Sequence, residues 1–341
     1  MRRIGRQDGA AGREFRHDLL DGAGGPEDLA EEFDAPETID ALAAVLAGSG
    51  HAVVRLGAGR TFLERMLADP PDLVFNIAEG LAGRSREAQV PAVCEMLGVP
   101  CTGSDPLTLA ATLDKDVAKR IVASHGLATP RHLLVHRVEE LPAGPAPGGL
   151  AFPLIVKPAW EGSSKGVRLA SKVASPEALR EQTAFVLGGY GGPAIVEEFC
   201  EGEEFTVGVI GNDPPRAIGV MQIRHRTLPP ADFLYSLEVK RDWQRQVEYL
   251  VPPPVLPDLL ARIETLALDC YRALGCRDVA RVDVRLRGGV PQFIEVNPLP
   301  GLSPTYGDLP ILSGRLGWTH ARLVEEIVRC ALERSSRPPG S

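Results

Sequence analysis

The sequence lacks the features expected of a membrane, secreted or nucleic-acid-binding protein. Its 341 residues contain no run of 18 apolar residues, so no transmembrane helix is expected. The basic start Met1–Arg6 has no apolar stretch behind it, unlike a signal peptide. The formal net charge of −8 provides no positive surplus for nucleic acid. With only 5% aromatic residues, leucine, valine, alanine and isoleucine must form most of the core.

Familiar cysteine and glycine motifs are also missing. The six cysteines are scattered and form no C-x-x-C pair, which favours reduced, mostly buried thiols of a cytoplasmic protein. The segment Gly57–Phe62 lacks the third glycine of a dinucleotide-binding loop, and no G-x-x-x-x-G-K-[ST] loop occurs. There is no internal repeat. Neither of the two common nucleotide loops is therefore available.

Strand and helix signals alternate in the N-terminal third of the chain. The stretches 51–56 and 72–77 have the apolar character of strands, whereas apolar spacing predicts a helix beginning at Pro36 and another over 88–97. This alternation predicts a parallel α/β layer. Residues 1–30 are rich in glycine and charge and contain no clear strand.

The length predicts two or three compact domains. Beyond residue 104, the expected helices cover Asp114–Ser124, a segment from about Pro176, Pro257–Leu274 and Ala321–Arg334. The expected strands cover Phe152–Val156, Val167–Leu169, Pro193–Glu197 and Phe205–Ile210. Two stretches are expected to be irregular: the linker Leu141–Leu150 and a long functional loop, Met221–Tyr249.

A predicted hairpin near residue 288 gathers polar side chains on one face. Residues two apart on a strand share a face, so Arg281 and Asp283 point together, as do Glu295 and Asn297. A two-residue loop would turn Glu295 away from Asp283. We therefore predict an odd-length loop, or a bulge that restores the register. Hard cations such as Mg²⁺ take such oxygen ligands, usually beside substrate phosphates. The alternative is a polar hairpin at the sheet surface.

Lysines and a glycine-rich loop suggest contacts with phosphate. The loop Glu161–Gly166 lets backbone N–H groups approach an anion, and Lys165 adds charge. Lys157 ends an apolar strand just before it, and Lys115 stands at a helix start, where the helix dipole favours anions. The alternatives are a flexible hairpin tip, a lysine extending from the sheet edge and an ordinary surface lysine.

An acidic corner begins where a strand ends at Glu197. A carboxylate there could accept a hydrogen bond from an adenine amino group, while the following backbone groups read the ring. The corner extends through Glu198 and Cys200 to Glu204. The alternative is a solvated acidic turn.

Taken together, these motifs occur in the order typical of the ATP-grasp superfamily, and the chain resembles its D-alanine–D-alanine ligase family. The resemblance spans about residues 72–334. The segments that carry it are Leu113–Lys115, Ile155–Pro158, Glu161–Gly166, Glu197–Cys200, Glu204–Val207, Arg281–Asp283 and Glu295–Pro298.

The resemblance implies an α/β and α+β protein, in which an N-terminal parallel α/β (pre-ATP-grasp) domain precedes a two-subdomain ATP-grasp fold. The implied domains are residues 1–104, with 1–30 irregular, then 105–190 and 191–335, followed by a tail at 336–341. ATP would bind between the two ATP-grasp subdomains.

The resemblance also implies a role for each matching residue. Lys115 and Lys157 would hold phosphates beneath a loop of Ser163, Ser164, Lys165 and Gly166. Glu197 would bind the adenine amino group, and the backbone of Glu198 and Cys200 would contact the adenine ring. Glu204 would bind the ribose. Asp283, Glu295 and Asn297 would hold two Mg²⁺ ions, with Mn²⁺ as a substitute. Arg281 and the N–H of Gly301 would stabilise an oxyanion, and Lys240, on a mobile loop, would face phosphate. Ser163 completes the implied catalytic set.

The substrate side departs from the family. The family's first strand and its substrate-binding glutamate are not recognisable in residues 1–30, and Glu32, Asp34 or Glu37 could replace that carboxylate. The family's aromatic residue after the mobile-loop lysine is replaced by Arg241. Another departure is a segment containing Glu79, Arg84 and Arg86. Beyond Gly301, where the family has a serine that holds the carboxylate of the second substrate, this chain has Ser303–Asp308, which includes Tyr306. The arginines suggest an additional anionic group on one substrate.

These observations predict a cytoplasmic, ATP-dependent ligase that joins a small-molecule carboxylate to an amine through an acylphosphate, with substrates other than two D-alanines. A D-alanine–D-alanine ligase of cell-wall synthesis and an ATP-binding protein without turnover are the alternatives. The expected ligands are ATP and Mg²⁺, with neither a nucleic-acid nor a membrane partner. A homodimer is a further expectation from the resemblance.

Overall fold

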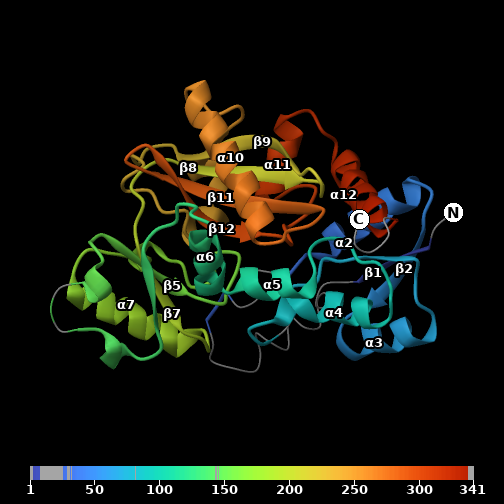
Figure 1. The fold of residues 1–341 in the computed structure, drawn as a ribbon, viewed down its shortest axis with the longest axis horizontal. Coiled ribbons are helices and arrows are strands. Elements are labelled where there is room, and N and C mark those ends of the chain that lie inside the picture. Colours follow the sequence, from blue (N-terminus) through green and yellow to red (C-terminus); the bar gives the residue numbers. More distant parts are fainter. Residues whose placement is uncertain are drawn as a thin grey trace.

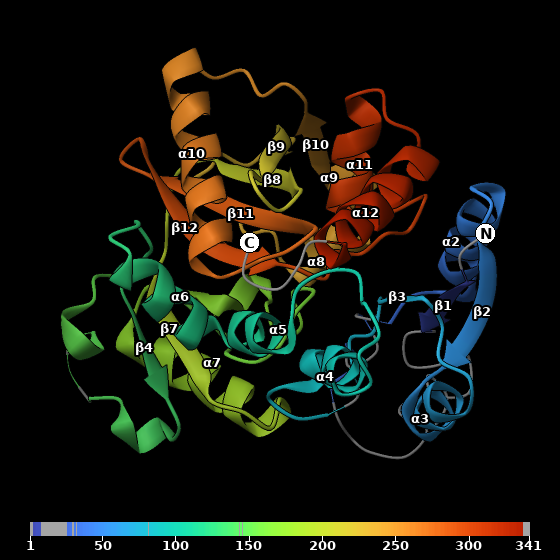
Figure 2. The ribbon, with the colours of Figure 1, turned by 45° about the vertical axis from the view of Figure 1, so that its right-hand side comes forward.

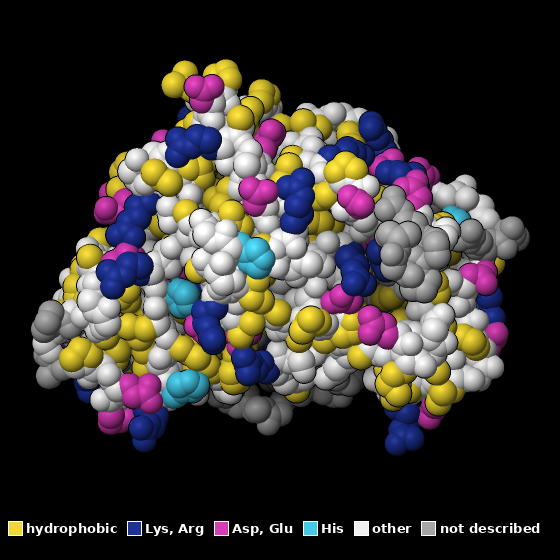
Figure 3. All heavy atoms as spheres, in the orientation of Figure 1, with side chains coloured by type: hydrophobic (Ala, Val, Ile, Leu, Met, Phe, Trp, Pro, Cys, Tyr) yellow, Lys and Arg dark blue, Asp and Glu magenta, His cyan; other side chains and the backbone are white. Residues whose placement is uncertain are grey.

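The computed structural model describes residues 3–7, 26–28, 31, 33–80, 82–142, 144 and 146–336. Three sheets form the framework (Figure 1), with strand orders β2-β1-β3, β4-β7-β5-β6 and β10-β9-β8-β11-β12. Acidic and basic side chains are interspersed over the face in Figure 3 rather than gathered by sign. Among the residues described, no helix has the length and apolar character needed to cross a membrane.

The first sheet is parallel, as predicted. Its central strand, however, was not expected from the sequence. β1 (Arg3–Gln7) lies between β2 (Ala52–Gly57) and β3 (Leu73–Phe75). The expectation that residues 1–30 lack a strand is therefore wrong. Ile4 is fully buried, but it is one apolar residue among polar neighbours, so the strand leaves no local pattern. Its stability comes from pairing on both sides.

Three of the next four helices in the chain pack on this sheet, and the fourth leads to the next domain. The predicted helices are confirmed as α2 (Pro36–Gly48), with proline at its start, and α4 (Gln89–Met96). Two further helices are α3 (Gly59–Ala68) and α5 (Pro106–Leu113). The Asp105 side chain caps α5 by accepting a hydrogen bond from the N–H of Thr108.

The second sheet is antiparallel and is covered by α7 (Pro176–Gly189) (Figure 1). Its strands are β4 (His132–Val135), β7 (Ala194–Glu198), β5 (Leu154–Pro158) and β6 (Lys172–Val173). Because β7 pairs with both β4 and β5, a boundary at residue 190 would split this sheet, and a boundary after Glu198 keeps it whole. The predicted strand Val167–Leu169 is wrong, because Arg168 and Ser171 cap a short 3₁₀ turn there.

The third sheet is antiparallel and carries the largest core, against α10 (Pro257–Ala273). Its strands are β8 (Glu204–Ile210), β9 (Arg216–His225), β10 (Val247–Leu250), β11 (Val279–Arg287) and β12 (Val290–Asn297). The expected loop 221–249 is largely wrong. It contains the end of β9, α8 (Leu237–Arg241), α9 (Trp243–Gln246) and β10, and only 226–236 and Asp242 lie outside a helix or strand.

The C-terminal helices join the third sheet to the first. α11 (Asp308–Arg315) follows β12, and α12 (His320–Ser335) lies beside α2 (Figures 1 and 2). Leu323 of α12 shares one hydrophobic cluster with Ile4 and Ile210, from the first and third sheets. α6 (Lys115–Ser124), capped by Asp114 as predicted, packs on β12 on the side facing the second sheet. The three sheets thereby surround a common central region.

Candidate active site

The predicted register of the β11–β12 hairpin is confirmed. Arg281 lies opposite Asn297, and Asp283 lies opposite Glu295. The loop contains only Gly288 and Gly289, which alone would misalign these pairs; a bulge between Asp283 and Val284, with Ile294 as the extra residue, restores them. The bulge also places Ile294 in the wall of the adjoining cavity.

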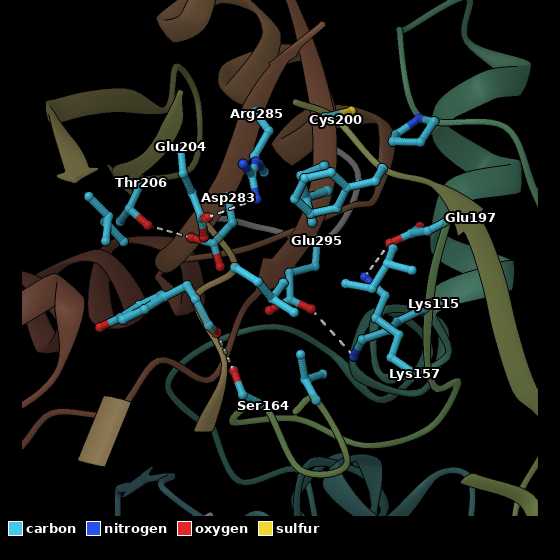
Figure 4. A pocket seen from close by; sticks show the side chains of 18 of the residues that line it. Lys115, Lys157, Ser164, Glu197, Cys200, Glu204, Thr206, Asp283, Arg285 and Glu295 are labelled. Atoms are coloured by element: carbon cyan, nitrogen blue, oxygen red, sulfur yellow. Dashed lines mark hydrogen bonds and ion pairs between the residues drawn. The ribbon is translucent and has the colours of Figure 1, made fainter. Parts of the chain in front are cut away.

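Asp283 is held by donors on both sides. Thr206 Oγ1 donates to its Oδ1 at 2.5 Å (Figure 4). Arg281 Nη2 donates to its Oδ2 at 2.8 Å. Burial raises the pKa of this carboxyl, Arg281 opposes that shift, and the facing Glu295 adds to it. Two facing carboxylates therefore repel one another in a site with little access to water.

Glu295 lies between Asp283 and the lysines of the opposite wall. Lys115 Nζ lies 3.4 Å from Glu295 Oε2. Burial alone would raise the pKa of Glu295, but Lys115, Lys157 and Arg281 outweigh it and hold the pKa well below its usual range. Asn297 Nδ2 lies 3.3 Å from Asp283 Oδ2, so the three predicted metal ligands lie together.

The donor set fits a hard divalent cation. The two carboxylates and the Asn297 amide can each supply an oxygen as a metal ligand. A cation between the carboxylates would relieve the repulsion of Asp283 by Glu295. No cluster of three or more His, Cys, Asp or Glu side chains suited to a metal occurs in the part of the chain that the structure describes. A cation held here would therefore depend on Asn297 and on oxygens from a ligand.

A cavity lies between the second and third sheets at this hairpin (Figure 4). Lys115, Lys157, Ser164, Lys165, Glu197, Glu198, Cys200 and Glu204, all predicted nucleotide-binding residues, line it. The apolar side chains of Ile155, Phe199 and Leu234 pack together in its wall. The cavity thus combines an apolar surface suited to a flat ring with lysines suited to phosphates.

A buried ionic cluster forms one end of this cavity. Glu197 Oε1 lies 2.5 Å from Lys157 Nζ, and its Oε2 lies 2.9 Å from Lys119 Nζ. Burial would raise the pKa of Glu197, but the two lysines lower it to about 2. Lys119 was missed by sequence reasoning although it stands four residues after Lys115, on the same face of α6. The signal that could have identified Lys119 was the scarcity of lysine, since the chain contains only six.

The acidic corner contains groups with different roles. The Glu198 carboxylate pairs with Arg287 and accepts from the N–H of Ala151, and its own N–H donates to Arg131 O. Burial raises the pKa of the Cys200 thiol to about 11, so it stays protonated. Burial also raises the pKa of Glu204 to about 7, although Arg285 lies 3.5 Å away and opposes the shift.

The glycine-rich loop is held from three directions. Ser163 and Ser164 adopt left-handed φ values of 48° and 61°. Ser164 Oγ lies 3.4 Å from the carbonyl of Tyr235, and Lys165 pairs with Glu161. The N–H of Gly166 donates to Asp28 at 2.9 Å. The Gly166 N–H therefore has an acceptor within the protein, and a contact between Gly166 and ATP stays a prediction.

A second, larger cavity adjoins the first. Residues in the walls of both are Lys115, Glu161, Lys240, Arg281, Glu295 and Asp308. The predicted residues Ser163, Asn297, Gly301, Asp34, Glu79, Arg241 and Tyr306 line the second cavity. Arg281 is fixed at the junction by Asp283 and by Asp308, which lies 3.1 Å from its Nη1.

Several predicted substrate residues lie elsewhere. Arg84 pairs with Asp114 at 2.7 Å and stacks on Trp160, and Arg86 Nη1 donates to the Trp160 carbonyl at 2.8 Å. Neither arginine lines a cavity described here, and they support the glycine-rich loop instead. Glu37 is exposed in the first turn of α2. Glu32 lies outside the described residues.

Comparisons with known proteins agree with this geometry. The family model for the D-ala D-ala ligase C-terminus matches residues 123–329. A D-alanine–D-alanine ligase of Desulforudis audaxviator is 32% identical over 305 residues, covering 86% of this chain and 92% of the relative.

Two solved structures share the fold. The D-alanine–D-alanine ligase from Bacillus anthracis, complexed with ATP, has a TM-score of 0.74 and 22% identity, and covers 98% of this chain and 99% of that one. The VanG D-Ala:D-Ser ligase from Enterococcus faecalis has a TM-score of 0.70 and 20% identity, and covers 97% and 99%.

The fold and the site define an ATP-grasp enzyme, an ATP-dependent, ADP-forming ligase that makes carbon–nitrogen bonds. Within that class, the chain belongs to the D-alanine–D-alanine ligase family.

Proposed function

We propose that the protein joins a small-molecule carboxylate to an amine through an acylphosphate, and that its substrates are not two D-alanines. The observation that carries the reaction class is the junction of the two cavities. Lys240, Arg281 and Glu295 belong to both walls. A phosphate at the end of a nucleotide in the first cavity would there meet a carboxylate in the second.

The nucleotide roles follow from charge and position. Lys115 and Lys157 would neutralise phosphates, and Glu204 would accept hydrogen bonds from ribose hydroxyls. We add Lys119 as the residue that keeps Glu197 ionised for an adenine amino group. Mg²⁺, held by Asp283, Glu295 and Asn297, would supply charge neutralisation at the phosphates.

The chain's own residues would position the reacting atoms. The substrate carboxylate attacks the terminal phosphorus, ADP leaves, and the amine then attacks the acyl carbon of the acylphosphate. That attack places negative charge on an oxygen near Arg281 and the N–H of Gly301, and phosphate leaves as the amide forms. The pKa of Arg281 is raised, because Asp283 and Asp308 outweigh its burial, so it stays charged throughout.

The altered specificity is supported by the wall between Gly301 and Asp308. Here, where the resemblance leads one to expect a serine that holds a substrate carboxylate, Asp308 presents a carboxylate of its own. An anion on the amine substrate would be repelled by it. The additional anionic group suggested by Arg84, Arg86 and Arg241 has less support, since all three arginines are bound to protein acceptors.

Purified protein with Mg-ATP and a panel of amino acids and simple amines tests this proposal. ADP formation should require a carboxylate and an amine together, and D-alanine alone should be a poor substrate. Strong ADP formation with D-alanine alone, and with no other substrate, would identify a D-alanine–D-alanine ligase instead. Nucleotide binding that no substrate pair converts to ADP formation would indicate a binding protein without turnover.

A cytoplasmic location belongs to the same proposal. It is supported by the requirement for ATP and by the six cysteines, all of which are free and five of which are buried.

A further inference from the structure

Three acidic residues near the N-terminus contact the glycine-rich loop and α8, the elements that carry Ser163 and Lys240. Glu27, Asp28 and Glu31, here named the acidic clamp, precede α2. Their partners are Gly166 at the end of the glycine-rich loop, Arg168, Tyr190, and Arg241 at the end of α8. None of these partners is close to the clamp in sequence, so the contacts exist only in the folded protein.

Asp28 anchors the glycine-rich loop. Its side chain is fully buried. Its Oδ2 accepts hydrogen bonds from the N–H of Gly166 at 2.9 Å and from Arg168 Nη2 at 3.3 Å, and the Tyr190 hydroxyl donates to the carboxylate at 2.9 Å. A buried carboxylate with three donors has one favourable position. Asp28 thereby fixes the point at which the Ser163–Lys165 turn ends.

Glu27 and Glu31 hold the helix that carries Lys240. Arg241 donates through Nε and Nη2 to Glu31 Oε1, at 3.0 and 2.6 Å, and through Nη1 to Glu27 Oε1 at 3.0 Å. Arg168 Nη1 lies 3.3 Å from that same Glu27 oxygen. Charges of alternating sign therefore run in the order Glu31, Arg241, Glu27, Arg168, Asp28, joining α8 to the glycine-rich loop.

We propose that the acidic clamp is a positioning device that sets the placement of Lys240 against the Ser163–Lys165 turn, with Arg241 and Asp28 as the positioning residues. The proposal rests on the proposed ligase function. Lys240 has no carboxylate partner among the ion pairs that the structure describes; its Nζ lies 5.0 Å from the centre of the Tyr235 ring. Because the acidic clamp holds Arg241, the residue next to Lys240 on α8, the clamp sets where the charge of Lys240 lies.

Kinetic measurements test the positioning role. Arg241→Glu should lower kcat about tenfold and change the KM for ATP less than about threefold, since the cavity end that holds Glu197 is unaffected. Adding Glu31→Arg to this variant should restore at least half of the loss in kcat, measured on a logarithmic scale. Arg245→Glu is the matched control, because Arg245 lies nearby on α9 with its side chain 87% exposed and a single ion pair at 3.9 Å. Equal kinetics for Arg241→Glu and Arg245→Glu would overturn the proposal, as would no recovery in the double variant.

Hydrogen exchange tests the clamp without catalysis. Asp28→Asn and Arg241→Glu should each accelerate amide exchange in 162–167 about tenfold in the protein bound to Mg-ADP, and Arg245→Glu should not. Exchange unchanged from the wild type in both variants would overturn the clamp even in an active ligase. If no substrate pair yields ADP but the variants show faster exchange, the ligase proposal fails and the clamp stands.

Discussion

Lys119 and Glu197 form an ion pair of 2.9 Å in which the lysine side chain is fully buried and the glutamate side chain is 3% exposed. Lys119 also donates to Thr129 Oγ1 at 3.1 Å. Burial lowers the pKa of Lys119, and Glu197 opposes that shift. The two charges therefore depend on each other, and both lie at one end of the first cavity.

Replacing Lys119 should destabilise the fold. Lys119→Met leaves Glu197 with Lys157 alone, so we expect a loss of about 3 kcal/mol in the free energy of unfolding, at the low end for a broken buried pair. Denaturant unfolding measures it. Arg120→Met, on the same helix and 73% exposed, is the control and should cost less than about 0.5 kcal/mol. Equal losses would contradict the role of burial.

The raised pKa of Glu204, about 7, predicts pH-dependent binding of nucleotide. Ribose hydroxyls donate to the ionised carboxylate, so affinity for ADP should rise as pH increases from 6 to 8, by at most about tenfold per unit. Calorimetric titration checks this. In the Glu204→Gln variant, the affinity for ADP should depend less on pH, because the titration of Glu204 is removed. The titration of the ADP phosphate contributes equally in the wild type and the variant. Identical slopes would exclude Glu204 from the site.

The same pKa shift has a consequence for stability. Because the folded-state pKa lies above the ordinary value of 4.5, the contribution of Glu204 to stability is fully present below pH 4.5 and is lost as pH rises through about 7. Near pH 8 the apo protein should therefore gain stability from Glu204→Gln, and near pH 4 it should not.

Gly166 should tolerate no side chain. Its φ is +71°, and an added Cβ would lie 2.5 Å from Pro158 Cγ and 3.0 Å from the Tyr190 ring. We expect Gly166→Ala to cost about 2–4 kcal/mol of unfolding free energy, by thermal or denaturant unfolding. Gly188→Ala, in α7 with open space around it, is the matched control and should stabilise by about 0.5–1 kcal/mol. A neutral Gly166→Ala variant would show that the loop is less tightly packed than described.

How much the sequence revealed depended on whether a signal was local. Asp283 and Glu295 were placed opposite each other correctly because strand periodicity and a short turn leave only two registers. Whether a longer loop or a bulge achieved this was open, since both satisfy the same pattern. Ile4 was missed because its burial comes from flanking strands that lie 48 or more residues away.

The contacts of the arginines were equally unpredictable. Arg84, Arg86 and Arg241 are separated in sequence from the acceptors that they contact, so composition could suggest charge but not its partner. Lys119 needed a different argument. Among only six lysines, four line the first cavity, and the spacing of Lys119 from Lys115 assigns it to the same helix face.

Asp283 should be needed for turnover but not for folding. Asp283→Asn keeps an oxygen at this position but removes the negative charge, so we expect kcat to fall about 100-fold or more. The melting temperature should change little, because the substitution also removes the repulsion between Asp283 and Glu295. Chelation by EDTA should abolish ADP formation by the wild type, and added Mg²⁺ should restore it. Asp269→Asn on α10 is the control; a fully active Asp283→Asn variant would remove Asp283 from the catalytic site.

Asp308 should determine which amines are accepted. It lies 3.1 Å from Arg281, in the wall of the second cavity. Asp308→Asn removes a negative charge from this wall, so the KM for amines that carry a free carboxylate should fall about tenfold, while amines without one should change little. The ratio of kcat/KM for an amino acid and its carboxamide measures this preference directly. Asp242→Asn, 44% exposed near α9, is the control and should leave that ratio unchanged. If Asp308→Asn lowers activity equally for both amines, then Asp308 serves only to hold Arg281, and the selection of the amine must depend on other residues of the second cavity.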